Sequence, residues 1–224
     1  GWIAAASALA STNEADPPHI ILMPEVPFVK KKFMDKVKQT VADEGFCVVV
    51  ASEGTRYKNG MFLADSGLTD AFGHKQLGGV APVLAQMISS IGLKNHWAVS
   101  DYLQRSARHI SSKTDLDQAY AVGKKAVEFA LAGKNAVMPV IKRLSDKPYK
   151  WKIESASLKK VANVEKTLPK KFISKCGFKV TKAGRNYLEP LIYGEAKVVF
   201  KKGIIDIARL KIFWTKRNYP ITDQ

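Results

Sequence analysis

The chain has 224 residues, of which 46% are hydrophobic and 25% charged, and this composition excludes fully disordered and fibrous proteins. Its two cysteines, Cys47 and Cys176, are too few for a disulfide framework or a cysteine-ligated zinc site. The longest apolar runs fall well short of the ~18 residues that cross a bilayer. With no visible secretory or transit segment, we expect a cytoplasmic location and no membrane partner.

The net charge of +16 is unevenly distributed along the chain. Residues 1–141 hold 15 Lys and Arg against 13 Asp and Glu, whereas residues 142–224 hold 21 against 7. A basic balance fits anionic partners such as nucleic acid, membrane headgroups or phosphorylated small molecules. Because the lysines of the second region occur singly or in pairs, a solvated basic surface is favoured there over a nucleic-acid site.

The first ten residues, GWIAAASALA, have the composition of a small-residue helix. Helices normally begin after a Ser, Thr, Asp or Asn cap, and none precedes Trp2. We therefore expect the chain to begin within a helix, as a piece of a longer protein. A processed or frayed terminus is the alternative.

The next elements alternate between strands and helices. His19–Met23 is a short β-branched run typical of a strand. Apolar residues at every fourth position from Phe33 to Val41 predict an amphipathic helix that ends at Gly45. Phe46–Ala51 is continuously apolar, which predicts a strand buried on both faces.

A long Gly-rich connection over residues 54–79 precedes a second predicted helix, Val80–Ile91. Trp97–Val99 is a third predicted strand. Thr114 is expected to cap a helix that ends at Gly133. The apolar face expected for this helix consists of Ala119, Val122, Ala126 and Phe129.

Ala136–Ile141 is a fourth predicted strand, Tyr149–Ile153 is a possible further one, and Thr181 is expected to cap a helix through Leu188. Strand–helix alternation at this spacing favours an α/β fold with a mainly parallel sheet.

Polar residues follow the predicted strands, where open α/β sheets bind ligands. Glu25 follows the first strand, Glu53 the second, and Tyr102 and Arg105 the third. A carboxylate accepts hydrogen bonds from sugar hydroxyls, and a guanidinium binds phosphate through paired hydrogen bonds. These residues therefore suggest a sugar-phosphate pocket, with ordinary loop ion pairs as the alternative.

Two other patterns are less specific. Residues 76–79, QLGG, could bind an anion through backbone N–H groups before a helix, or form a tight turn. No metal-ligand spacing connects the four histidines, which are His19, His74, His96 and His109.

Several motifs together resemble one family. The longest is WAVSDYLQRSARHISSKTDLDQAYAVG at residues 97–123. The others, in chain order, are GWIAAA at the start, IILMPEVPF at 20–28, VVVASEG at 48–54, FGHKQLGG at 72–79 and GFKVTKAGRNYLEPLIYGEA at 177–196. They are similar to motifs of the pyrophosphate-dependent phosphofructokinases, and they cover essentially the whole chain in order.

The resemblance implies a three-layer αβα phosphofructokinase-type fold and a phosphotransferase with an alcohol acceptor. The implied reaction is reversible transfer of a phosphoryl group from pyrophosphate to fructose 6-phosphate in glycolysis, with Mg²⁺. The resemblance also implies a homo-oligomer, a dimer, for the full-length protein. By motif match, Glu53 would hold the sugar hydroxyls, and Tyr102 and Arg105 the sugar and its 6-phosphate. The sequence YLQRSA departs from the HIQRGG of ATP-dependent relatives, which favours pyrophosphate but leaves the donor open.

The resemblance also implies a domain division. Residues 1–103 would form the sugar-phosphate lobe, 104–150 a helix and strand of an incomplete phosphate-donor lobe, and 151–224 a basic C-terminal segment. The donor-binding GGDD and the TIDND segment with the general base do not occur in residues 1–224, so we expect this polypeptide alone to be inactive. We also expect uncovered apolar surface at Val122, Phe129 and Val137.

Two alternatives remain open at this point. Within the same family, the chain could belong to a non-catalytic regulatory subunit. In another class, it could be a nucleic-acid-binding module that uses its basic C-terminal segment, although no aromatic-and-basic cluster supports this.

Overall fold

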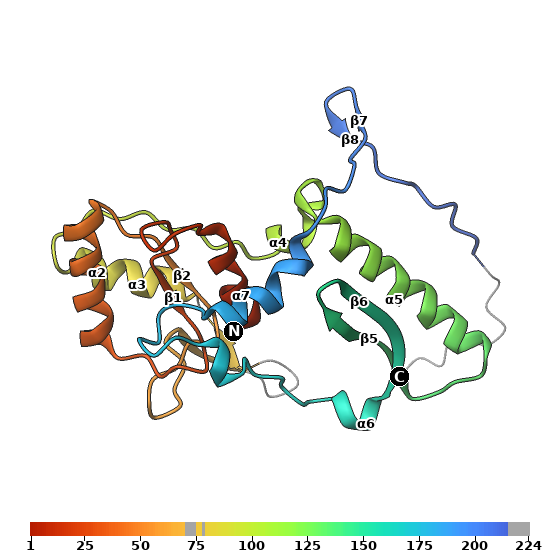
Figure 1. The fold of residues 1–224 in the computed structure, drawn as a ribbon, viewed down its shortest axis with the longest axis horizontal. Coiled ribbons are helices and arrows are strands. Elements are labelled where there is room, and N and C mark those ends of the chain that lie inside the picture. The colour runs from red at the N-terminus through yellow and green to blue at the C-terminus, as the bar shows by residue number, and fades with distance from the viewer. Residues whose placement is uncertain (70–74, 78, 215–224) are drawn as a thin grey trace, which may run out of the picture.

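The computed structural model describes residues 1–69, 75–77 and 79–214, whose helices and strands gather into two lobes (Figure 1). The first lobe contains α1 (Trp2–Ala6), the 3-10 helix η1 (Ser7–Ala10), β1 (Ile20–Leu22), α2 (Lys30–Glu44), β2 (Val49–Ala51) and α3 (Val80–Ser89). The second contains α5 (Lys113–Leu131), β5 (Val137–Asp146), β6 (Tyr149–Ser157) and α6 (Leu158–Val161).

Shorter elements connect or extend these lobes. The chain crosses from the first lobe to the second through α4 (Leu103–Ser106) and η2 (Arg108–Ile110), and it returns to η3 (Lys170–Phe172), α7 (Lys182–Leu188) and η4 (Glu189–Ile192). Two further strand pairs are β3 (Asp65–Thr69) with β4 (Lys75–Leu77), and β7 (Phe200–Lys201) with β8 (Ile204–Ile205). The β7–β8 hairpin projects from the molecule in Figure 1.

The centre of the first lobe has three layers. β1 and β2 pair in parallel, with Ile20 opposite Val49. Successive side chains of a strand point to opposite faces, and accordingly Ile20 packs in one buried cluster with α2 and α3, while Ile21 packs in another with α1 and α7. The expected αβα arrangement is therefore present, with a single parallel pair as its sheet among the residues described.

The helices predicted from apolar periodicity in this lobe are confirmed. In α2, Phe33 and Val37 are almost completely buried, and burial of each such side chain contributes about 1.5–3 kcal/mol. Gly45 ends the helix with a left-handed φ of 80°, a conformation that glycine adopts without a Cβ clash. α3 likewise buries Val80 and Leu84.

Two strand predictions in the first lobe need correction. Phe46–Ala51 was expected to be buried on both faces, but the strand begins only at Val49, and Phe46 is 51% exposed. No strand forms at Trp97–Val99, where Trp97 is 57% exposed. Within the described chain β2 pairs only with β1, so the other edge of β2 has no strand partner there.

The fourth predicted strand belongs to a hairpin and not to a parallel sheet. β5 and β6 pair antiparallel from Val137 opposite Ser157 to Asp146 opposite Tyr149. Only Lys147 and Pro148 separate the two strands, and a parallel crossover needs a dozen or more residues. The predicted strand at Tyr149–Ile153 is confirmed as the start of β6.

α5 is confirmed as a helix, although its cap and buried face differ from expectation. The cap is Ser112, whose Oγ accepts a hydrogen bond from the Asp115 N–H, and not Thr114. Ala119 and Ala126 are exposed. The uncovered surface expected at Val122, Phe129 and Val137 is not present, since Phe129 is buried and the two valines are half-buried where the β5–β6 hairpin packs on α5.

The last part of the chain is divided between the lobes. Residues 151–157 continue the β5–β6 hairpin, so the boundary expected at residue 150 falls inside β6. Leu168 and α7 join the buried cluster of α1, and the Ile21 N–H donates to the backbone oxygen of Phe178. α7, capped by Thr181 as predicted, therefore belongs to the core of the first lobe.

Cys47 and His19 both have structural surroundings in the first lobe. Cys47 packs against the core of the first lobe, and this burial raises the pKa of its thiol. The buried His19 ring accepts the Val48 N–H at Nδ1 and contacts the Ala15 oxygen through Nε2, so both of its nitrogens have backbone partners. Within the described ranges, no helix has the length and apolar character needed to cross a membrane.

Candidate functional site

Glu53 lies in a turn directly after β2. The Ser52 N–H donates to the Leu22 oxygen, which extends the parallel pairing to the end of the strand. The chain then reverses, because Thr55 donates to the Ser52 oxygen through both its N–H and its hydroxyl. Three hydrogen bonds therefore fix the backbone on either side of Glu53, whose side chain remains exposed.

Tyr102 and Arg105 lie on one helical turn at the start of the crossing. Asp101 adopts a left-handed φ of 44°, and the N–H groups of Arg105 and Ser106 both donate to the Tyr102 oxygen. Positions three residues apart on a helix share a face. The Arg105 guanidinium carbon accordingly lies 5.6 Å from the centre of the Tyr102 ring.

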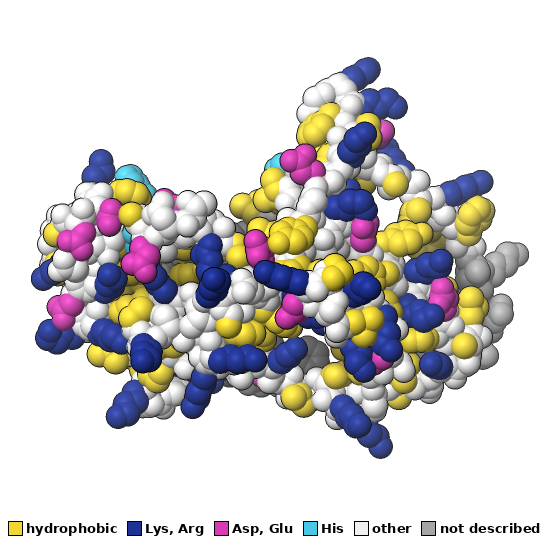
Figure 2. Space-filling view, viewed as in Figure 1, with side chains coloured by type: hydrophobic (Ala, Val, Ile, Leu, Met, Phe, Trp, Pro, Cys, Tyr) yellow, Lys and Arg dark blue, Asp and Glu magenta, His cyan; other side chains and the backbone are white. Residues whose placement is uncertain are grey.

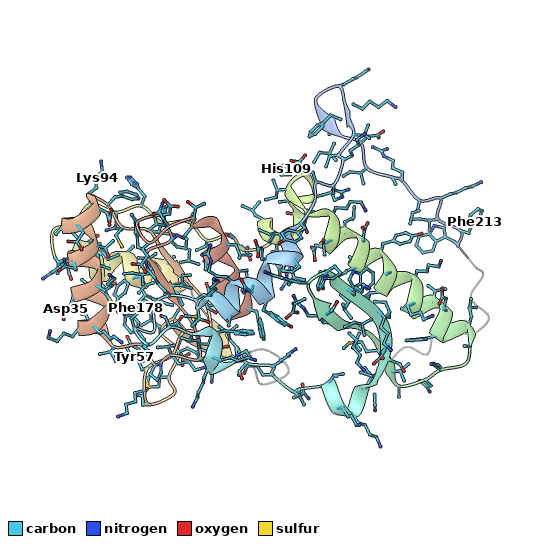
Figure 3. The ribbon with its side chains drawn as sticks, in the orientation of Figure 1. Asp35, Tyr57, Lys94, His109, Phe178 and Phe213 are labelled. Carbon is cyan, nitrogen blue, oxygen red and sulfur yellow. The ribbon has the colours of Figure 1, made fainter. Side chains whose placement is uncertain are left out.

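One broad cleft is lined by all three predicted site residues. It has a volume of about 1640 Å³, and Glu53, Tyr102 and Arg105 all line it. Lys94 and His109, labelled in Figure 3, mark the ends of the stretch that carries Tyr102 and Arg105 from the first lobe toward α5. Tyr102 is 69% exposed, so its ring and hydroxyl are available to a ligand.

Glu25, also expected from its place after a strand, takes no part in this cleft. The Val26 N–H donates to the Met23 oxygen in a tight turn, and the Glu25 carboxylate accepts a 2.7 Å hydrogen bond from the Leu168 N–H. Glu25 therefore holds the returning chain. The sequence pattern identified the strand end correctly but not the direction of the turn that follows it.

The cleft also has walls that the search for polar strand ends missed. Trp2 of α1 lines it on one side, Leu84 of α3 on another, and His96 and Trp97 on the approach to Tyr102. Sequence patterns predicted helices at α1 and α3 but did not indicate that their side chains line a cleft. His74 lies outside the described residues, and so does Gly78 of the QLGG pattern.

The described residues do not supply a metal centre of their own. In residues 1–69, 75–77 and 79–214, no group of three or more His, Cys, Asp or Glu side chains could hold a metal ion. The residues present therefore do not fit a site in which this chain alone binds Mg²⁺ through its side chains.

Comparison with known proteins assigns the family. The family described as Phosphofructokinase matches residues 1–130, which include β1, β2 and all three cleft residues. The chain belongs to the phosphofructokinase family. The match ends within α5, so the family assignment rests on the first lobe and the crossing.

Relatives of the phosphofructokinase family match almost the whole chain. A pyrophosphate--fructose 6-phosphate 1-phosphotransferase of Halomonas elongata is 57% identical over 221 residues, which are 98% of this chain and 53% of that protein. The chain thus spans about half the length of the relatives it matches.

Solved structures confirm the phosphofructokinase fold. The pyrophosphate-dependent phosphofructokinase from Marinobacter aquaeolei matches with a TM-score of 0.82 and 49% identity, covering 98% of this chain and 52% of that one. The enzyme of the same description from Nitrosospira multiformis matches with a TM-score of 0.75 and 48% identity, covering 95% and 52%. These similarities extend beyond residue 130 and include the second lobe.

Proposed function

We propose that this chain supplies the fructose 6-phosphate side of the active site of a pyrophosphate-dependent phosphofructokinase. The observation that carries the proposal is the shared cleft of Glu53, Tyr102 and Arg105. It is supported by the family assignment and by the activity for which relatives such as the Halomonas protein are named. In this proposal residues 1–103 bind the sugar phosphate, and the hairpin and α5 belong to the lobe that faces the phosphoryl donor.

Each cleft residue has a distinct role in binding. The Arg105 guanidinium pairs with the 6-phosphate, the Glu53 carboxylate accepts hydrogen bonds from sugar hydroxyls, and the Tyr102 ring and hydroxyl contact the sugar. In the reaction, the 1-hydroxyl of the sugar gives its proton to a general base outside residues 1–224, and its oxygen forms a bond to one phosphorus of pyrophosphate. The bridging P–O bond breaks and phosphate leaves. Positioning and charge stabilisation dominate such transfers, and this chain contributes the positioning of the acceptor.

Pyrophosphate is the proposed donor, because the Halomonas relative and both structural neighbours are named as pyrophosphate-dependent enzymes. Mg²⁺ would neutralise charge on the transferring group, and its ligands would come from outside the described residues, which form no cluster that could hold it. A cytoplasmic location and a dimer of the full-length protein are further parts of the proposal.

Calorimetric titration of fructose 6-phosphate into residues 1–224 tests the binding role. A charge-assisted hydrogen bond contributes about 1.5–3 kcal/mol, so Arg105→Met is expected to weaken binding at least tenfold. Arg209→Met is the matched control, since Arg209 is exposed and does not line the cleft. Equal affinity of Arg105→Met and the unmodified chain would remove Arg105 from the site.

An assay of phosphate release tests whether residues 1–224 bind the sugar phosphate without catalysing phosphoryl transfer. With pyrophosphate, fructose 6-phosphate and Mg²⁺, residues 1–224 alone are expected to give no turnover, because GGDD and TIDND are absent from them. A full-length relative of this chain is expected to be active. Turnover by residues 1–224 would contradict the proposal, and sugar-phosphate binding by an inactive full-length protein would favour the regulatory-subunit alternative.

A further inference from the structure

An arginine of the second lobe is stacked between two tyrosines from different lobes. The Arg143 guanidinium carbon of β5 lies 4.7 Å from the ring centre of Tyr149 in β6 and 4.2 Å from that of Tyr187 in α7. Its Nη1 donates a 2.6 Å hydrogen bond to the Tyr187 backbone oxygen, and its Nε is paired with Asp146 at 2.6 Å. Only 16% of the side chain is exposed, so the guanidinium is held in one position between the lobes.

The stack continues into the core of each lobe. On one side, Tyr187 lies 5.7 Å from the ring of Trp2 and 5.2 Å from that of Phe172, and both rings belong to the first lobe. On the other side, the Tyr149 hydroxyl accepts a 2.7 Å hydrogen bond from Gln118, which is buried in α5. Arg143 is therefore the central member of a continuous row of contacts from α1 to α5.

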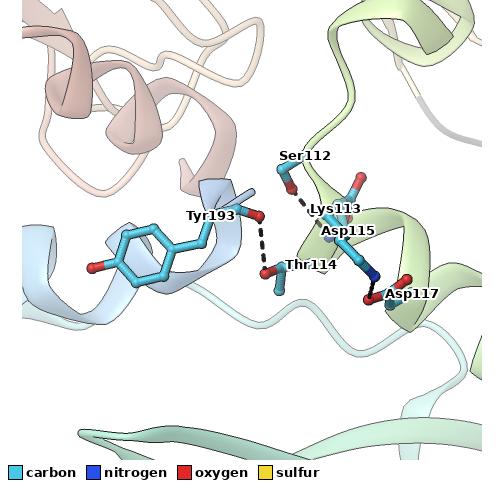
Figure 4. A network of polar contacts seen from close by, with 6 residues as sticks. All are labelled: Ser112, Lys113, Thr114, Asp115, Asp117 and Tyr193. Carbon is cyan, nitrogen blue, oxygen red and sulfur yellow. Dashed lines mark hydrogen bonds and ion pairs between the residues drawn. The ribbon is translucent and has the colours of Figure 1, made fainter. Parts of the chain in front are cut away.

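A second set of contacts joins the start of α5 to η4 and to its C-cap, Tyr193 (Figure 4). The Thr114 hydroxyl and N–H both donate to the Tyr193 oxygen, and the Ser112 hydroxyl donates to the Leu191 oxygen. η4 follows α7 directly, so Lys182–Ile192 is one continuous segment. Its α7 part contacts the first lobe, and its η4 part contacts the start of α5, where the crossing ends.

These two sets of contacts bear on the cleft. Tyr102 and Arg105 lie on the crossing, whose far end is fixed to η4. Glu53 instead lies in the turn directly after β2, whose Val49 and Ala51 pack against the buried cluster of the first lobe. The first lobe already holds α7 in its core, and Arg143 adds a contact to α7 from β5 of the second lobe. The orientation of the second lobe and of the end of the crossing therefore depends on Arg143 together with the η4 contacts.

We propose that Arg143 is a positioning residue that fixes the two lobes relative to each other and thereby keeps Tyr102 and Arg105 in the cleft that Glu53 also lines. The proposed effect of Arg143 on sugar-phosphate binding rests on the proposed function. Its proposed effect on the orientation of the two lobes does not. The planar guanidinium is essential, since a lysine ammonium cannot stack on two rings at once and donate to the Tyr187 oxygen from the same place.

Distance measurement between spin labels tests the inference directly. Labels are attached to Lys38→Cys in α2 and Lys124→Cys in α5, both exposed, in a chain that also carries Cys47→Ala and Cys176→Ser. Arg143→Met removes the stack and Arg143→Lys retains only the charge. Lys142→Met is the control, because Lys142 is its neighbour in β5, is 55% exposed and pairs with Glu154.

We expect one narrow distance distribution for the otherwise unmodified chain and for Lys142→Met, and a broader or shifted one for Arg143→Met. Arg143→Lys is expected to resemble Arg143→Met. A narrow distribution at an unchanged distance in Arg143→Met would overturn the inference, and so would a broad distribution in the chain that retains Arg143. If Arg143→Met fails to fold, Tyr149→Leu removes one face of the stack and is judged by the same two outcomes.

Calorimetry with fructose 6-phosphate separates the two proposals. Where the chain binds the sugar phosphate, Arg143→Met is expected to weaken binding severalfold although Arg143 does not line the cleft. Where the unmodified chain does not bind it, the proposed function fails and the distance distributions still decide the role of Arg143. Unchanged affinity beside a broadened distribution would overturn the link between Arg143 and the cleft.

Discussion

The indole Nε1 of Trp2 donates a 2.8 Å hydrogen bond to the backbone oxygen of Lys166. Two residues further on, the Leu168 N–H donates to the Glu25 carboxylate at 2.7 Å. Both contacts lie on the segment that returns from α6 to η3. The first lobe therefore holds the returning chain at two successive points before α7 joins its core.

Trp2→Phe tests the first of these points. The substitution keeps an aromatic ring beside Phe172 and Tyr187 but removes the donor, and a hydrogen bond of this kind contributes about 0.5–1.5 kcal/mol. We expect urea-induced unfolding to show a free energy of unfolding lower by about 1 kcal/mol. Trp214→Phe, at a side chain that is 90% exposed, is the control and is expected to have no effect. Equal unfolding curves for all three proteins would show that the Trp2 bond adds nothing to stability.

Glu25 and Glu53 are expected to respond to substitution in opposite ways. Glu25→Ala leaves the buried Leu168 N–H without its acceptor, which costs about 1–3 kcal/mol of stability, and should leave binding of fructose 6-phosphate unchanged. Glu53→Ala removes an exposed side chain in the cleft, so binding should weaken at constant stability.

Thermal unfolding and calorimetry on the same two variants check this contrast. Glu25→Gln serves as a control for Glu25, because its amide oxygen can still accept the Leu168 N–H. Loss of sugar-phosphate binding in a stable Glu25→Ala variant would place Glu25 in the site and contradict the division drawn from the structure.

Two glycines in helical surroundings are expected to give opposite effects when replaced by alanine. Gly45 ends α2 with φ of 80°, a conformation that costs an alanine about 1–2 kcal/mol, so Gly45→Ala should destabilise the protein. Gly123 lies inside α5, where alanine is favoured by about 0.5–1 kcal/mol, so Gly123→Ala should stabilise it. An added Cβ has no neighbour within 4 Å at either position, so backbone preference alone decides the sign. Urea unfolding measures both changes, and a shift of the same sign for both would refute this reasoning.

The helices could be predicted from the sequence because their signals are local. The spacing of Phe33, Val37 and Val41, and the glycine at residue 45, define α2 without reference to any other segment. Strands depend on distant partners. Trp97–Val99 has the composition of a strand but pairs with no strand in the part of the chain that the structure describes. The strand expected at Ala136–Ile141 pairs with the segment directly after it.

The cleft residues could be named because motif resemblance added information that composition lacks. Strand-end position alone suggested Glu25 and Glu53 equally, and the structure places only Glu53 in the cleft. Arg143 could not be found in this way, because its two ring partners are Tyr149 and Tyr187, one close in sequence and one 44 residues away. The excess of Lys and Arg over Asp and Glu did not locate a binding site, since Lys and Arg side chains are spread over both lobes on the face shown in Figure 2.

The exposed surface of α5 predicts self-association of residues 1–224. Tyr120, Val127 and Leu131 are 75%, 60% and 84% exposed, and their spacing of seven and four residues places them on one face of the helix. An apolar stripe of this kind on a long helix favours contact with another apolar surface. Light scattering of residues 1–224 is therefore expected to show species larger than a monomer. The double variant Val127→Glu, Leu131→Glu should reduce their mass, whereas the control Ala126→Glu, which adds a charge at an exposed position on a different face, should not. A monodisperse monomer of the unmodified chain would show that this stripe is tolerated in water.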